Sequence, residues 1–265
     1  MEKICVDLQA QYLELDTLVS GLGEAVWSMA TPFFGWTIFD QVAHVAFFDH
    51  QALIAIEQPE SFGQGKRMIL QLLASEGEWP AKTNPLLGPK HPDELMPLWR
   101  RIRYDLLNGL KQLAPKDRIG WFGPEMSAIS FASARLMETW AHAQDVFDTL
   151  GLHRQNSARL RHVAHIGVTT FPWSFAVNNL PVPRIRPRVE LIGPSGQHWV
   201  WGEPDATQTV TGSAEAFCLV VTQRRNIADT NLRIEGVQVR QWLGIAQAFA
   251  GIAQAPPAPG KRVIR

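Results

Sequence analysis

The stretch Arg135-Leu136-Met137-Glu138-Thr139-Trp140-Ala141-His142 lies in a segment whose apolar residues recur every three to four positions, so we expect it to be helical. Glu138 and His142 are four residues apart, which places their side chains on one helix face, one turn apart. A carboxylate and an imidazole in this arrangement are within reach of one metal ion. Solvated helix faces show the same spacing, so the pair alone leaves both interpretations open.

His44, in the segment Asp40-Gln41-Val42-Ala43-His44-Val45-Ala46, is the candidate for a third ligand from another helix. Two imidazoles and one carboxylate give a divalent ion three protein ligands and leave one position for water or substrate. That open position distinguishes a catalytic zinc site from a closed structural site. In segment 127–150 the apolar stripe lies nearly opposite Glu138 and His142, which fits a solvated face and a site-facing one equally well.

The first two thirds of the chain have helical periodicity. It predicts helices at about residues 5–29, 38–57, 63–76, 93–113, 127–150 and 156–178. Thr37 and Asp40 have the spacing of a capping box at a helix start. Residues 77–92 hold four prolines and are expected to form a long loop, which in a compact domain often borders a binding site.

Three prolines between residues 180 and 187 interrupt the helical pattern and predict an extended connector. Beyond this connector the pattern changes to that of a small α+β domain. Strands are expected at 188–192, 198–201, 207–211 and 231–235, and helices at 213–224 and 238–250. The predicted organisation is therefore a helical bundle at 1–179, a small α+β domain at 188–252 and a flexible tail at 253–265.

The composition is that of an ordinary globular chain, with 265 residues, 46% hydrophobic and 19% charged. Lys plus Arg and Asp plus Glu number 25 each, so there is no basic field of the kind that favours nucleic acid or anionic membranes. No apolar run approaches the roughly 20 residues that span a bilayer. Cys5 and Cys218 are isolated, and the chain start lacks the pattern of a signal peptide, so we expect a cytoplasmic protein.

Three short motifs carry a resemblance to a known family. Gly35-Trp36-Thr37, followed by Asp40 and His44, resembles the start of the second helix in the DinB-like bundle superfamily. The pattern Arg135-x-x-Glu138-x-x-x-His142-x-x-Asp145 resembles the fourth-helix motif of its mycothiol-dependent maleylpyruvate isomerase branch. In the second half, Val210-Thr211-Gly212-Ser213-Ala214 leading into 217–225 resembles a helix start in domains related to sterol carrier proteins.

The resemblance implies a four-helix bundle with a His, Glu, His zinc site, followed by a small sterol-carrier-like α+β domain. Carried over to this chain, the metal ligands would be His44, Glu138 and His142. The resemblance also implies a catalytic arginine in the second domain, for which Arg224 has the nearest position and Arg225 follows it. This chain has Gln223-Arg224 where relatives often have a Gly-Arg pair, and arginines at a helix end also complement its negative dipole.

Asp145 lies three residues after His142 and is a candidate to accept a hydrogen bond from a ligand histidine. A surface contact with Arg135 is the alternative. His162 and His165 are expected to be packing residues rather than ligands.

The resulting hypothesis is a metal-dependent enzyme, with Zn²⁺ as the expected ion, that activates a low-molecular-weight thiol. It would catalyse isomerisation of, or thiol transfer to, an electrophilic organic substrate. The expected partner is a small-molecule substrate, with no nucleic acid and no membrane, and a homodimer is left open. Metal-dependent hydrolysis, iron at the same three ligands, and a non-catalytic small-ligand or lipid-binding protein are the alternatives.

Overall fold

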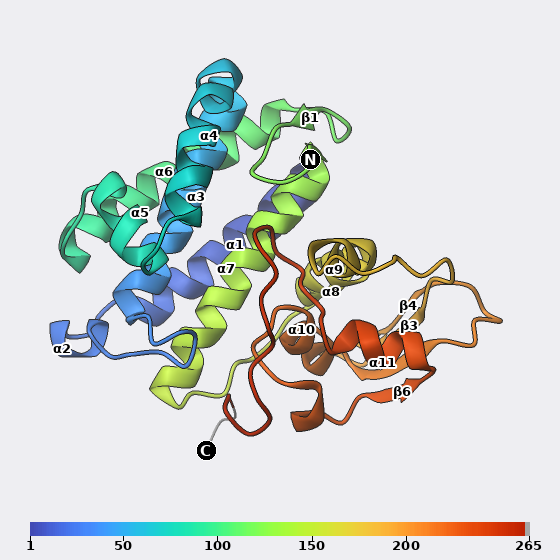
Figure 1. Ribbon diagram of the computed structural model, residues 1–265. Coiled ribbons are helices and arrows are strands. Elements are labelled where there is room, and N and C mark those ends of the chain that lie inside the picture. The colour runs from blue at the N-terminus through green and yellow to red at the C-terminus, as the bar shows by residue number, and fades with distance from the viewer. Residues whose placement is uncertain (263–265) are drawn as a thin grey trace. The chain divides into compact units, whose positions relative to one another are not determined.

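The computed structural model describes residues 1–262. The chain divides into two compact units, Met1–Leu150 and Gly151–Arg265 (Figure 1). The first unit is mostly helical and the second combines helices with a small sheet, which confirms the predicted fold class. Among the described residues, no helix has both the length and the apolar character that crossing a membrane requires.

A bundle of long helices forms the first unit. Its helices are α1 (Glu2–Val19), α3 (Ile38–Glu57), α6 (Pro92–Gln112) and α7 (Ala128–Leu150). Helices α1 and α3 each pack against both α6 and α7, so the four helices close a ring around one apolar core. The shorter elements of the unit are α2 (Glu24–Trp27), α4 (Pro59–Ala74), α5 (Trp79–Leu87), β1 (Arg118–Ile119) and β2 (Met126–Ser127). Helices α4 and α5 pack against α3.

One buried carboxylate joins all four helices of the bundle. Asp49 of α3 accepts hydrogen bonds from Tyr12 Oη of α1 at 2.8 Å, Trp99 Nε1 of α6 at 2.9 Å and Arg135 Nε of α7 at 2.9 Å. Its side chain is fully buried. A buried carboxylate is tolerated when charge-assisted hydrogen bonds replace its water, and here each bond comes from a different helix.

The second unit is built around a sheet with strand order β4-β3-β5-β6. Its strands are β3 (Arg188–Ile192), β4 (His198–Trp201), β5 (Thr209–Ser213) and β6 (Arg233–Glu235). Strand β3 pairs antiparallel with β4 and parallel with β5, and β5 pairs antiparallel with β6. Its helices are α8 (Leu160–Thr169), α9 (Phe171–Val177), α10 (Ala214–Val221), the 3₁₀ helix η1 (Ile227–Asp229) and α11 (Val237–Leu243).

The boundary between the two units lies after Leu150. The sequence pattern predicted it at the proline connector, residues 180–187. Residues 151–179 were predicted to belong to the bundle, but α8 packs against α10 of the second unit. The contact is close at Gly167, where an added Cβ would lie 2.6 Å from a methyl group of Val221 and 3.0 Å from the ring of Phe217. Periodicity shows that a helix has an apolar face, but not which neighbour covers it.

Two local features also differ from the expectation. The predicted loop 77–92 contains α5, in which Pro80 occupies the first turn, where a missing N–H is tolerated. The helix predicted at 5–29 ends at Val19, and Gly21 follows with a φ of 86°, which a glycine adopts readily.

The described part of the predicted flexible tail is held by hydrogen bonds. Gln223 Nε2 donates to the carbonyl of Gln254 at 2.8 Å, and Asn226 Nδ2 donates to that of Pro257 at 2.7 Å. The last part of that tail, residues 263–265, lies outside the described residues.

Because of the close contact at Gly167, we expect a single added methyl group there to lower the stability of the second unit. Gly167→Ala should lower the free energy of unfolding of the second unit by about 1–3 kcal/mol, because the new methyl group overlaps Val221 and Phe217. Gly63→Ala in α4 is the matched control, since nothing lies within 4 Å of its added Cβ. It should be neutral or stabilising by up to about 1 kcal/mol. Denaturant unfolding of both variants tests this, and a Gly167→Ala protein as stable as Gly63→Ala would contradict the packing described.

A second prediction concerns Asp16 of α1, which forms ion pairs with Arg100 and Arg103 of α6. Burial alone would raise the pKa of Asp16, but hydrogen bonds from Arg100 and Arg103 outweigh it and lower the pKa from 3.8 to about 2. The stabilisation that these ion pairs give the folded state is therefore complete above pH 3.8 and is lost as the pH falls through about 2. Asp16→Asn should lower the free energy of unfolding by about 1–2 kcal/mol at pH 7. Denaturant titrations at several pH values should show this difference shrinking below pH 4, and a difference independent of pH would contradict the ion-pair explanation.

Candidate metal centre

His44, Glu138 and His142 lie together in the first unit. Each offers one potential ligand atom, and these atoms all lie within 4.8 Å of one another. The ring centroids of His44 and His142 are 4.4 Å apart, and His142 Nε2 lies 3.5 Å from Glu138 Oε2. The structure thus brings together the three residues that the sequence selected as candidate ligands.

The start of α3 fixes the position of His44. The amide of Asp40 donates to Thr37 Oγ1 at 3.1 Å, and the amide of Thr37 donates to Asp40 Oδ2 at 2.9 Å, so the predicted capping box is confirmed. Asn84 Nδ2 of α5 donates to the other carboxylate oxygen of Asp40 at 2.7 Å. The cap therefore sets where α3 begins and also anchors α5 beside it.

The position of α7 relative to α3 depends on Arg135, one turn before Glu138. Arg135 Nε donates to Asp49 Oδ1 at 2.9 Å, and both side chains are buried. Burial alone would lower the pKa of Arg135, but the charges of Asp49 and Glu138 outweigh it and raise the pKa. Arg135 therefore stays protonated. Its ion pair with Asp49 joins α7 to α3 and so places Glu138 and His142 near His44.

Aromatic rings surround the two histidines. The indole of Trp36 is nearly parallel to the His142 ring, with a centroid distance of 6.1 Å and an interplanar angle of 4°. The further ring contacts are Phe33 with His142, and Trp36, Phe48 and Trp79 with His44. Glu138 is the most open of the three candidate ligands, since its side chain is 21% exposed whereas that of His142 is 3% exposed.

The second nitrogen of His142 contacts Gln41, a residue that the sequence pattern does not single out. His142 Nδ1 lies 2.5 Å from Gln41 Oε1, whereas Asp145 Oδ2 lies 4.0 Å away. Gln41 is fully buried and stands one turn before His44 on α3. Its position three residues before a candidate ligand was the only available signal, because an amide in a helix has many other roles.

The donor set fits a divalent metal ion. Two imidazoles and one carboxylate are ligands that Zn²⁺ binds in three-ligand protein sites. Metal-bound histidines commonly donate their other N–H to an oxygen, and the contact between His142 and Gln41 has this character. The assignment of these three residues as metal ligands stays a prediction.

Arg224, the predicted catalytic arginine, lies in the second unit after the end of α10. It is 2% exposed, and its Nη1 donates to the carbonyl of Thr222 at 2.8 Å. The preceding Gln223 has a φ of 60°, a conformation that glycine adopts most readily. The Gln223 side chain donates to two backbone carbonyls, those of Ala246 and Gln254, which holds it in this conformation. A catalytic role of Arg224 stays a prediction.

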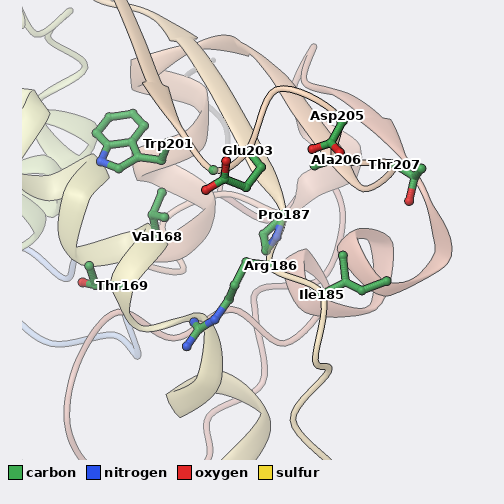
Figure 2. Close-up of a pocket in the computed structure, with 11 residues that line it drawn as sticks. Val168, Thr169, Ile185, Arg186, Pro187, Trp201, Glu203, Asp205, Ala206 and Thr207 are labelled. Carbon is green, nitrogen blue, oxygen red and sulfur yellow. The ribbon is translucent and has the colours of Figure 1, made fainter.

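A groove in the second unit is an alternative candidate site, with a volume of about 790 Å³. Figure 2 shows the Arg186 side chain on one side of it and those of Glu203 and Asp205 on the other, with Asp205 beside Ala206 and away from Trp201. All three charged residues are exposed, so water already solvates them. They do not form the convergent set of donor atoms found in the first unit.

His165 lies beside this groove and is satisfied within its own unit. Its Nδ1 accepts a hydrogen bond from Trp201 Nε1 at 3.2 Å. Burial, together with His162 and Arg161, lowers the pKa of His165, which favours the neutral accepting ring. His165 is nevertheless exposed, so its role as a packing residue stays a prediction.

A family model described as the mycothiol maleylpyruvate isomerase N-terminal domain matches residues 8–147. This match spans the bundle helices and all three candidate ligands.

Two proteins of Mycobacterium tuberculosis are similar over nearly the whole chain. They are uncharacterized protein MT0041 of strain CDC 1551 / Oshkosh and uncharacterized protein Rv0036c of strain ATCC 25618 / H37Rv. Each is 43% identical over 255 residues, which cover 96% of this chain and 96% of the relative.

Two solved structures share the fold. The crystal structure of the mycothiol-dependent maleylpyruvate isomerase aligns with a TM-score of 0.53 and 16% identity, covering 83% of this chain and 87% of that one. A mutant of that isomerase aligns with a TM-score of 0.52 and 17% identity over the same shares of the two chains. At this level of identity the likeness supports the fold.

The geometry predicts one divalent ion per chain. His142→Ala should sharply reduce the metal content of purified protein after incubation with Zn²⁺, because it removes one of three ligands. Helical circular dichroism should remain, since the core of the bundle does not depend on this ring. His50→Ala, at the other α3 histidine outside the cluster, is the control and should retain the metal. Full retention of metal by His142→Ala would refute the assignment.

Proposed function

The chain belongs to the mycothiol maleylpyruvate isomerase N-terminal domain family, and from this we propose that it is a metal-dependent enzyme that uses a small thiol. Its reaction would be isomerisation of an electrophilic organic substrate or transfer of the thiol to it. The observation that carries the proposal is the convergence of one carboxylate and two imidazoles within 4.8 Å.

His44, Glu138 and His142 would hold the ion, for which Zn²⁺ is the proposed metal. A divalent ion with three protein ligands and an open position lowers the pKa of a bound thiol, so that the thiol is a thiolate at neutral pH. The rings of Phe33 and Trp36 against His142 keep water from that side of the cluster. Charges act more strongly where water is excluded.

The thiol must come from outside the chain. Cys5 and Cys218 are both buried and free. Burial raises the pKa of the Cys5 thiol and raises that of Cys218 well above its ordinary value. A thiol that is buried and protonated is a poor nucleophile. Two reduced thiols also support the proposal that the protein acts in the cytoplasm.

The chemistry proposed for the thiol is conjugate addition. The thiolate sulfur forms a bond to one carbon of a conjugated double bond, and the displaced electron pair moves onto the conjugated carbonyl oxygen. The remaining single bond rotates, and reversal of the addition expels the thiolate and restores the double bond in the other geometry. If the adduct is protonated instead, the product is a thioether and the reaction is a thiol transfer.

The name of the solved relatives includes mycothiol, so mycothiol is the thiol to test first. We propose a small-molecule substrate with a conjugated carbonyl group. We also retain Arg224 as the catalytic arginine, and the sterol-carrier relationship of the second unit, as parts of the proposal.

Cobalt provides the test. Addition of mycothiol or β-mercaptoethanol to the Co²⁺-loaded protein should produce a sulfur-to-cobalt charge-transfer band, because only a thiolate bound to the ion gives this transition. Ethylene glycol, which lacks sulfur, should give no such band. A Cys5→Ser, Cys218→Ser double variant should keep the band, which would show that the sulfur is not the chain's own.

Arg224→Ala should leave the band and the metal content unchanged but slow turnover of a conjugated substrate. If no thiol produces the band while simple esters or amides are cleaved, the protein is a metal-dependent hydrolase and the thiol proposal is wrong. If neither occurs, the protein is better explained as a small-ligand binder.

A further inference from the structure

Gln41 links the candidate metal ligands to the loop that precedes α3. On one side its Oε1 lies 2.5 Å from His142 Nδ1, and on the other its Nε2 donates to Thr31 Oγ1 at 2.7 Å. The Thr31 hydroxyl in turn lies 3.5 Å from the carbonyl of Phe33, to which it donates. Gln41 is fully buried and Thr31 is 4% exposed, so solvent does not compete for these contacts.

The position of the hydrogen on His142 determines whether this ring can bind a metal ion. A neutral imidazole carries one hydrogen and offers one lone pair. With the hydrogen on Nδ1, directed at the carbonyl oxygen of Gln41, the lone pair is on Nε2. That nitrogen is the one that lies 3.5 Å from Glu138 Oε2, on the side of the candidate ligands.

The orientation of the Gln41 amide therefore matters. In the reverse orientation its NH₂ group would point at His142 Nδ1, and the hydrogen of the ring would have to be on Nε2. The ring would then direct an N–H at Glu138 in place of a lone pair. Thr31 Oγ1 fits the productive orientation, because it accepts from Gln41 Nε2 at 2.7 Å while its own hydrogen faces the carbonyl of Phe33 at 3.5 Å. In the reverse orientation the hydroxyl would have to turn away from Phe33 and donate to Gln41 Oε1.

We propose that Gln41 is a positioning residue, held by Thr31, that keeps the His142 lone pair directed at the metal site. The inference rests on the proposed metal site but not on the reaction proposed for it. Thr31 belongs to the same loop as Phe33 and Trp36, whose rings contact His142. One loop thus contributes both the hydrogen bond that orients the amide and the rings that enclose the histidine.

The test is the affinity for Zn²⁺, measured by competition with a chromophoric chelator. Gln41→Met removes both hydrogen bonds at nearly constant volume and should weaken Zn²⁺ binding roughly 10–100-fold, as the loss of an outer-shell partner does elsewhere. Gln41→Glu keeps an acceptor for Nδ1–H and should retain the affinity of the wild type or exceed it. Thr31→Val removes the acceptor of the Gln41 Nε2 hydrogen bond and should weaken Zn²⁺ binding less than Gln41→Met does.

Gln11→Met is the matched control, because Gln11 is also a buried glutamine of the first unit but lies on α1. It should leave the affinity unchanged. Thermal unfolding of each metal-free variant separates a loss of affinity from a loss of folding. If Gln41→Met does not fold, the comparison of Thr31→Val and Gln41→Glu with the wild type decides in its place.

A second readout does not depend on affinity. In the Zn²⁺-loaded wild type, ¹⁵N-labelled His142 should show its proton on Nδ1 and a metal-bound Nε2. A proton on Nε2, or Gln41→Met with the affinity of the wild type, would overturn the inference and leave the proposed function intact. If Gln41→Met weakens Zn²⁺ binding but no thiol produces the charge-transfer band in the wild type, the proposed function is wrong and the inference stands. A wild-type protein that binds no Zn²⁺ would refute both.

Discussion

The structure of the first unit depends on one buried carboxylate, that of Asp49. Its desolvation would cost several kcal/mol if it were left without partners, and it is stable because α1, α6 and α7 each supply a donor. These contacts can form in only one register of the four helices. Because Arg135 is the donor from α7, this register also brings Glu138 and His142 opposite His44. The contact that stabilises the bundle is therefore the contact that assembles the site.

Spacing along the sequence made Glu138 and His142 candidate ligands, and the resemblance to a known family selected them together with His44, which the structure brings beside them. Glu138 and His142 share a helix face by their separation alone, and the helices that carry the cluster follow from apolar periodicity. Gln41 could not be selected in the same way. Its role depends on which atom of another helix its amide meets, and no spacing rule records that. The expected acceptor Asp145 had a carboxylate at a suitable spacing, yet it lies farther from His142 Nδ1 than Gln41 does.

The boundary between the units was less predictable than the elements themselves. Prolines at 180–187 mark a break in secondary structure, but a domain boundary is where packing partners change. Helix α8 precedes that break and nevertheless packs on α10, with Gly167 providing the space for Val221. The prolines of 77–92 predicted a loop, but the segment contains the helix α5. Pro80 occupies the first turn of this helix, where proline is tolerated.

The two sides of the candidate site differ in their exposure to solvent. The histidines are enclosed by the loop that carries Trp36 and Thr31 and by the buried amide of Gln41, whereas the Glu138 side chain is partly exposed. Under the proposed function a substrate would approach where the site is open, so the choice of substrate would be set on the Glu138 side. Binding of the proposed ion, in contrast, would depend on the enclosed side around His142. If the proposal holds, residues on the Glu138 side could change the substrate without any change at the histidines.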